Sequence, residues 1–92
     1  MEKTTEQKIW DEVNAIGTLL SGKNKAYGDS AVNPVNIFSK GNAVDSLSAR
    51  IDDKIMRIKN KGINDNTEDT VSDLIGYLIL LKIALKETDD TK

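Results

Sequence analysis

The sequence predicts an all-α protein, and three observations support this fold class. Apolar residues recur at helical spacing in three separate segments of the chain. No stretch alternates apolar and polar residues over a useful length, as a half-buried β-strand would. With 92 residues, the chain has room for one small domain with a thin core, which a few helices can form. We therefore expect a single helical domain over residues 1–92, with three helices in each protomer.

The first helix is expected over residues 5–21. Thr4 and Gln7 fit a capping box, in which each side chain accepts a hydrogen bond from the other residue's backbone N–H. Ser21 and Gly22 supply a stop signal. The apolar residues between these ends follow at helical spacing: Ile9, Val13, Ile16 and Leu20.

A long loop is expected next, over residues 23–41. Gly28, Asn33, Pro34 and Gly41 punctuate this segment, and no period is sustained in it. A loop of this length in so small a domain is usually functional or disordered. We expect a functional loop here.

The second and third helices are expected over residues 42–60 and 67–86. Gly62 lies just past the end of the second helix, and Asn66 or Thr67 is expected to cap the third. The tail, residues 87–92, has the composition of a frayed and solvated end. The apolar row of the second helix is Val44, Leu47, Ile51, Ile55 and Ile58, and the main row of the third is Val71, Leu74, Leu78, Leu81 and Leu85.

The third helix is apolar on more than one side, which predicts a homo-oligomer. Two partner helices within one chain can hardly cover all of its apolar surface. We expect most simply a dimer whose helices complete a four-helix-like bundle. The apolar residues outside the main row are Ile75, Ile79, Leu80 and Ile83.

Composition excludes several classes of function. The sequence has no cysteine and no histidine, so it lacks a disulfide framework, a thiolate metal site and the usual zinc ligand. Its net charge of −2 gives no basic excess to bind duplex nucleic acid. The longest apolar run, residues 74–85, is shorter than the roughly 20 residues that span a bilayer. The polar N-terminus resembles neither a signal nor a transit peptide, so we expect a cytoplasmic protein without a membrane partner.

A stripe of charged residues borders the apolar row of the second helix. Arg50, Asp53, Lys54 and Arg57 follow at i, i+3, i+4 and i+7, which places them along one side of a helix. One interpretation is a solvated face whose ion pairs satisfy one another, each worth only a few tenths of a kcal/mol. The other interpretation is a site, and this helix alone does not decide between them.

The residues of the third helix favour the interpretation of this stripe as a binding site. Asp69, Asp73 and Tyr77 follow at i, i+4 and i+8, on a side that becomes apolar at Leu80 and Ala84. Carboxylates on a partly enclosed face need compensation, either from the cations of the second helix or from a divalent cation. Two carboxylates one turn apart suit Mg²⁺, and Arg and Lys beside it suit phosphate. The alternative for Asp69 alone is a capping role at the helix N-terminus.

The segment "KNKAYGDS", residues 23–30, adds groups suited to a nucleotide. Tyr27 suits stacking on a base, and Asn24 suits a hydrogen bond to a base edge or a ribose hydroxyl. Gly28 permits a left-handed backbone, and Asp29 is a further potential metal ligand. An ordinary turn is the alternative interpretation of these residues.

Three segments, in order, carry a resemblance to a known family: "KNKAYGDS", "RIDDKIMRIKN" and "EDTVSDLIGY". Together they resemble the nucleotide modification associated domain 1 family, small helical proteins found largely in phages and bacteria. That family is similar to the MazG-like all-α nucleotide pyrophosphohydrolases. The resemblance implies a MazG-type oligomer in the cytoplasm of a bacterial host cell.

The resemblance also implies a set of site residues. Ligand-binding positions would be Lys23, Asn24, Tyr27, Gly28, Arg50, Lys54, Arg57 and Tyr77, with Glu68 beside them. Mg²⁺ would be held by Asp69 and Asp73, helped by Asp53 or Asp29. The Glu-Glu-x-x-Glu motif of MazG-like enzymes does not occur in this sequence.

Two hypotheses of function follow. The first is a nucleotide-binding protein that uses Mg²⁺ and, if it is an enzyme, releases pyrophosphate from a nucleoside triphosphate through metal-activated water. The second hypothesis involves no catalysis. The protein would be an oligomeric phage protein that sequesters nucleotides or cyclic-nucleotide signals, or an interaction module.

Overall fold

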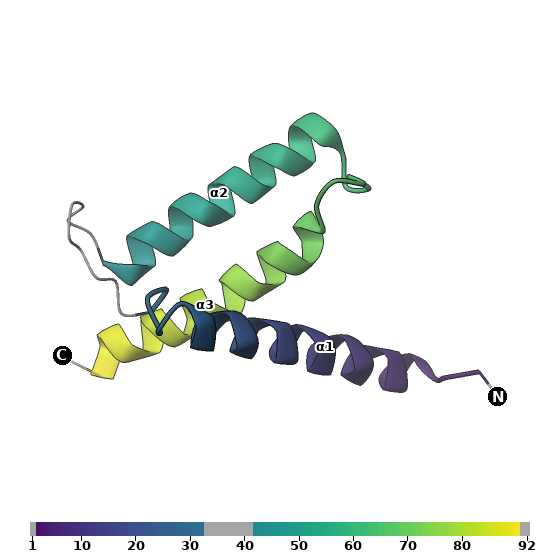
Figure 1. Ribbon diagram of the computed structural model, residues 1–92, viewed down its shortest axis with the longest axis horizontal. Coiled ribbons are helices and arrows are strands. Elements are labelled where there is room, and N and C mark those ends of the chain that lie inside the picture. Colours follow the sequence, from purple (N-terminus) through teal and green to yellow (C-terminus); the bar gives the residue numbers. More distant parts are fainter. Residues whose placement is uncertain (1, 33–41, 91–92) are drawn as a thin grey trace.

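The computed structural model describes residues 2–32 and 42–90, and in this part of the chain it is all-α, as predicted (Figure 1). Its three helices are α1 (Thr5–Ala26), α2 (Ala43–Lys61) and α3 (Thr70–Asp90). Residues 33–41 of the predicted loop lie outside the described residues. None of the described helices is long and apolar enough to cross a membrane.

Helix α1 begins as predicted but ends later. The Thr4 hydroxyl accepts a hydrogen bond from the Gln7 N–H at 3.1 Å, and the Gln7 side chain accepts one from the Thr4 N–H at 2.8 Å, which confirms the capping box. The predicted stop at Gly22 is wrong, because α1 continues to Ala26. A glycine inside a helix lowers the stability of the helix by only about 0.5–1 kcal/mol relative to alanine. The hydrogen bonds of the turn that follows Gly22 are enough to offset this cost. Lys23 therefore lies on α1 and not in a loop.

Helices α2 and α3 form an antiparallel pair that contains most of the core (Figure 1). The Asn42 side chain accepts a hydrogen bond from the Asp45 N–H at 2.8 Å and so caps α2. Gly62, with φ of 88°, follows the end of α2, in the position expected from the sequence. The buried cluster joins the first half of α2 to the second half of α3 through Ala43, Leu47, Leu80 and Ala84.

The start of α3 corrects the predicted cap. The Asp69 carboxylate accepts hydrogen bonds from the Ser72 N–H at 3.1 Å and the Ser72 hydroxyl at 2.7 Å. Asp69, rather than Asn66 or Thr67, therefore satisfies the first turn of α3, and the helix begins at Thr70. The C-terminal end differs too, because α3 reaches Asp90 and includes part of the expected frayed tail.

The buried side of α3 also differs from the predicted main row. Leu80 and Ala84 are buried against α2, whereas Leu78 and Leu85 are 44% and 46% exposed. Because α3 is apolar on several sides, periodicity alone could not show which side faces α2. The expectation that the side carrying Asp73 becomes apolar and enclosed further along the helix is confirmed.

Helix α1 packs on α3 only near its own C-terminal half (Figure 1). Leu20 lies against Gly76 of α3, where a Cβ atom would come within 3.4 Å of the Leu20 Cδ1 atom. The N-terminal half of α1 extends away from the other two helices, and the only buried residue of α1 is Ile16, at the middle of the helix. The chain has a radius of gyration of 15.2 Å, whereas a compact domain of this length has about 12 Å.

Candidate functional site

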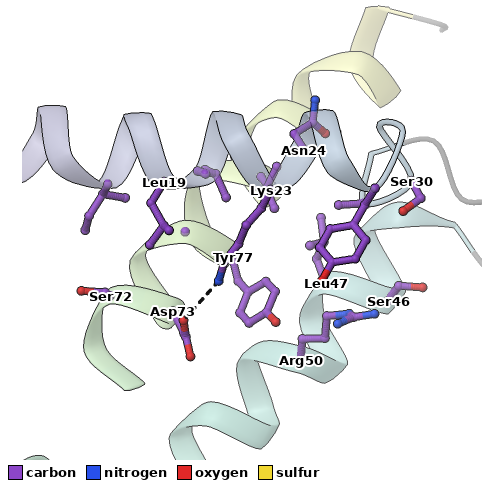
Figure 2. A pocket seen from close by; sticks show the side chains of 16 residues that line it. Leu19, Lys23, Asn24, Ser30, Ser46, Leu47, Arg50, Ser72, Asp73 and Tyr77 are labelled. Atoms are coloured by element: carbon purple, nitrogen blue, oxygen red, sulfur yellow. Dashed lines mark ion pairs between the residues drawn. The ribbon is translucent and has the colours of Figure 1, made fainter. Parts of the chain in front are cut away.

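A pocket of about 590 Å³ lies where the C-terminal half of α1, the first half of α2 and the first half of α3 meet (Figure 2). Apolar side chains form part of its lining, and polar and charged side chains from all three helices form the rest. Leu19, Leu20, Leu47 and Leu80 contribute to the apolar part. The polar and aromatic lining consists of Lys23, Asn24, Tyr27, Ser30, Ser46, Arg50, Ser72, Asp73 and Tyr77.

The end of α1 and the turn after it form one wall of the pocket. Lys23 and Asn24 lie on the last turn of α1, and Tyr27 ends the helix by donating its N–H to the Lys23 carbonyl at 2.9 Å. Gly28 then adopts the left-handed conformation anticipated from the sequence, with φ of 62°. Gly28 does not line the pocket itself, but its turn leads the chain back so that Ser30 does.

Helix α2 contributes one cation that faces an aromatic ring. The Arg50 guanidinium carbon lies 5.9 Å from the centre of the Tyr77 ring on α3, within the range of a cation–π contact. Among the described residues, Arg50 has no acidic partner within ion-pair distance. Ser46 lies one helical turn before Arg50 and lines the same wall. Arg50 thus has charge available for an anion in the pocket.

Lys23 is the second cation of the pocket. Figure 2 shows its side chain pointing from α1 toward Asp73 on α3. The Lys23 Nζ and Asp73 Oδ1 atoms are 4.0 Å apart, at the outer limit of an ion pair, and the Lys23 side chain is half exposed. Lys23 is therefore only loosely paired, and it shares the pocket with Arg50.

Lys54 and Arg57 lie outside the pocket, which corrects the prediction that they line one wall with Arg50. Lys54 Nζ contacts Glu68 Oε1 at 2.8 Å and Asp73 Oδ2 at 3.3 Å. Arg57 Nε contacts Asp65 Oδ2 and Glu68 Oε2, both at 2.8 Å. These pairs fasten α2 to the segment between α2 and α3, and we call Lys54, Arg57, Asp65 and Glu68 the clasp. Of the predicted stripe, only Arg50 faces the pocket.

The clasp shifts the pKa of three of its members. The hydrogen bond from Lys54 holds the pKa of the Glu68 carboxyl below its ordinary value. Hydrogen bonds from Thr67, and then from Arg57, lower the pKa of Asp65. The hydrogen bond to Glu68 raises the pKa of Lys54, although partial burial acts in the opposite direction. All three shifts favour the charged forms that the ion pairs need.

The four predicted metal ligands do not converge. Asp69 caps α3, Asp53 is exposed on α2, and Asp29 lies in the turn after α1. Asp73 faces the pocket, but its carboxylate is beside Lys54 and Lys23. In residues 2–32 and 42–90, no group of three or more acidic side chains is placed to hold a metal ion. Asp69 therefore has the capping role at the helix N-terminus that was the alternative to metal binding.

The sequence interpretation did not include several residues of the pocket and the clasp. Ser46 and Leu19 could have been found by extending the rows of Arg50 and Lys23 by one turn toward the N-terminus. Asp65 and Thr67 had no helical row to indicate them. Their contacts with Arg57 depend on the path of the chain between α2 and α3.

Comparisons with protein-family models, with curated proteins and with solved structures found no match. Function must therefore be inferred from the pocket and from the division of the cations between pocket and clasp.

Proposed function

We propose that the protein binds a nucleotide in the pocket between the three helices. One observation carries this proposal: two cations with little or no acidic pairing, Lys23 and Arg50, share the pocket with two tyrosines, Tyr27 and Tyr77. An anionic group and a planar ring in one small molecule would satisfy both features. The volume of about 590 Å³ is within the range usual for small-molecule sites.

The phosphate end of the ligand is assigned to Arg50 and Lys23. Arg donates two parallel hydrogen bonds to phosphate oxygens, and Lys acts as a mobile point charge. Arg50 is already placed over Tyr77, which restricts its conformations before the ligand arrives. Less side-chain entropy is then lost on binding.

The base is assigned to the aromatic side of the pocket. Tyr27 is 72% exposed, an unusually open position for an aromatic ring beside a pocket, and its face is available for stacking. Asn24 and the Ser30 and Ser46 hydroxyls offer donors and acceptors to base edges and ribose hydroxyls. Base stacking on an aromatic side chain contributes about 1–3 kcal/mol.

Between the two hypotheses from the sequence, the arrangement favours binding without turnover. Asp73 is the one acidic side chain lining the pocket in the described part of the chain, and Lys54 already neutralises it. A Mg²⁺-dependent pyrophosphohydrolase remains the alternative, and it requires acids that converge on the ligand phosphates. The proposed setting, taken from the family resemblance, is a phage protein acting in the cytoplasm of a bacterial host.

Isothermal titration calorimetry tests the proposal. The probes are the four ribonucleoside and four deoxyribonucleoside triphosphates and their monophosphates, in buffer with EDTA and separately with MgCl₂. A pyrophosphate-release assay on the same samples separates binding from turnover. Saturable binding that Arg50→Ala weakens and Lys59→Ala leaves unchanged supports the proposal. If none of these nucleotides binds in either buffer, the proposal is wrong.

We also propose that the protein works as a homo-oligomer, most simply a dimer. The chain exposes 7430 Å², whereas a monomeric protein of 10.1 kDa exposes about 5300 Å². An excess of about 2000 Å² for each protomer matches the large apolar interfaces of obligate homodimers. Many of the exposed apolar side chains lie on the projecting half of α1 and along α3, among them Ile9, Trp10, Val13, Ile75, Leu78, Ile79 and Ile83.

A further inference from the structure

The Lys54 ammonium group lies between two carboxylates at the edge of the pocket. Its Nζ atom is 2.8 Å from Glu68 Oε1 and 3.3 Å from Asp73 Oδ2, and its side chain is only 17% exposed. Two protein carboxylates that converge on one cation are the usual protein contribution to a Mg²⁺ site. Here the cation at the centre belongs to the chain itself.

We propose that Lys54 is a built-in cation that takes the place of a divalent metal ion between Glu68 and Asp73, so that the pocket binds its ligand without metal. The part of this inference that concerns the ligand rests on the proposed nucleotide-binding function. The part that concerns metal ions does not.

The surroundings of the two carboxylates leave little for a metal ion to bind. Glu68 Oε2 contacts Arg57 Nε at 2.8 Å and accepts a hydrogen bond from the Thr70 hydroxyl at 3.3 Å. Asp73 Oδ1 has Lys23 at 4.0 Å. The charges of the clasp, Asp73 and Lys23 are balanced before any ion arrives. A divalent cation would have to displace a well-shielded ammonium group, and it would meet the repulsion of the neighbouring cations.

This arrangement gives Lys54 a positioning role in ligand binding. Lys54 does not line the pocket, so it acts through Asp73, which does. While Lys54 holds one oxygen of Asp73, Lys23 can leave the other oxygen and move to a phosphate without exposing an unpaired carboxylate. A metal ion between the acids would otherwise be needed for that compensation.

Titration with Mn²⁺ alone, followed by electron paramagnetic resonance, tests the metal part. We expect the wild-type protein to leave Mn²⁺ free at millimolar concentration. Lys54→Met removes the ammonium group and keeps the length of the side chain, and we expect it to gain Mn²⁺ binding that Lys54→Met/Asp73→Asn loses. Lys59→Met, on the exposed side of α2, is the matched control and should behave as wild type. Mn²⁺ binding by wild-type protein that Asp73→Asn abolishes would overturn the inference.

Calorimetry with a bound nucleotide tests the ligand part. We expect wild-type affinity in EDTA and in MgCl₂ to agree within about twofold, and Lys54→Met to bind about tenfold more tightly in MgCl₂ than in EDTA. A wild-type affinity that rises tenfold or more with MgCl₂ would contradict the inference. This wild-type comparison decides the matter even if Lys54→Met does not fold. If no nucleotide binds, the proposed function is wrong, while the Mn²⁺ titration still decides the role of Lys54.

Discussion

Arg50 and Arg57 lie two helical turns apart on α2, yet their guanidinium groups have different partners. Arg50 lies over the Tyr77 ring at 5.9 Å and faces the pocket, whereas Arg57 Nε pairs with Asp65 and Glu68 at 2.8 Å. The same row of charges thus contains one residue available to a ligand and one that fastens α2 to the segment before α3. Binding and stability should therefore respond differently to the loss of each arginine.

Arg57→Ala should lower the thermal midpoint of unfolding by several degrees and leave nucleotide affinity within about twofold. The reason is that Asp65 and Glu68 lose their shared cation and the segment before α3 loses its attachment to α2. Differential scanning calorimetry checks the stability, with Lys59→Ala as the control. Weaker binding with an unchanged midpoint would show that Arg57 contacts the ligand.

Arg50→Ala should have the opposite effect. We expect nucleotide affinity to fall about tenfold or more, because a charge-assisted contact to phosphate is lost, while the midpoint of unfolding stays within a degree or two. Arg50→Lys should restore only part of the affinity, because Lys lacks the planar fork that binds phosphate with two hydrogen bonds. Equal affinities for Arg50→Ala and wild type would remove Arg50 from the site.

Tyr27→Ala should weaken nucleotide binding by about 5- to 150-fold, the range expected for one lost base–aromatic stack. Tyr27→Phe keeps the ring and should retain most of the affinity. Inorganic triphosphate has no base, so its affinity should not change in either variant. Similar losses for nucleotide and inorganic triphosphate would show that Tyr27 supports the fold of the turn instead of a base.

Val13→Glu should convert the protein to a monomer. Val13 is 50% exposed on the projecting half of α1, and a charge there would be buried in the proposed interface. Thr18→Glu, on the opposite side of the same helix, is the matched control. Size-exclusion chromatography with light scattering should give twice 10.1 kDa for wild type and the control, and 10.1 kDa for Val13→Glu. A wild-type monomer at micromolar concentration contradicts the proposed oligomer.

Stability should fall at acid pH and stay level through neutrality. The folded-state pKa values of Asp65, Glu68 and Asp69 are lower than their ordinary values, so their stabilising contribution is complete above those values and disappears as the pH falls below about 4. The pKa of Lys54 is raised, so its contribution is complete below pH 10.5 and is lost as the pH rises further. The sequence has no histidine to titrate between these limits.

Urea denaturation at pH 3, 5, 7 and 9 checks this pH dependence. Glu68→Gln should be less stable than wild type at pH 7 and should lose less stability between pH 5 and pH 3. If Glu68→Gln and wild type lose the same stability over that interval, the ion pairs of Glu68 do not contribute to the pH dependence.

The sequence predicted the helices well because their caps and periods are local signals. The capping box of Thr4 and Gln7 and the position of Gly62 both agree with the structure. The end of α1 was predicted too early because Gly22 was treated as a stop. A single glycine does not end a helix, and α1 continues for one more turn to its cap at Tyr27. The buried side of α3 was missed because Leu78 and Leu80 are equally apolar, and only the position of α2 distinguishes them.

The site was predictable only in part, for a different reason. Helical spacing correctly brought Asp73 of α3 to face the charged row of α2, where it contacts Lys54. Helical spacing could not show which basic residues of α2 would form the ion pairs of the clasp. The acidic partners, Asp65 and Glu68, lie in the irregular segment between α2 and α3, where no helical period applies. The same limit applies to Asp69, because a carboxylate at this position can either cap the helix or bind a ligand. In the structure it accepts hydrogen bonds from the Ser72 N–H and hydroxyl, and so it caps the helix.

Binding of a nucleotide in the pocket between α1, α2 and α3 can be followed residue by residue in a ¹⁵N-resolved NMR titration of the wild-type protein with a nucleoside triphosphate. We expect the largest changes in amide chemical shift at Lys23, Asn24, Tyr27, Arg50 and Tyr77. The segment of residues 63–67, which includes Asp65 of the clasp, should change little. If no nucleotide causes a saturable shift, or if the shifts are concentrated at residues 63–67, a nucleotide does not bind in this pocket.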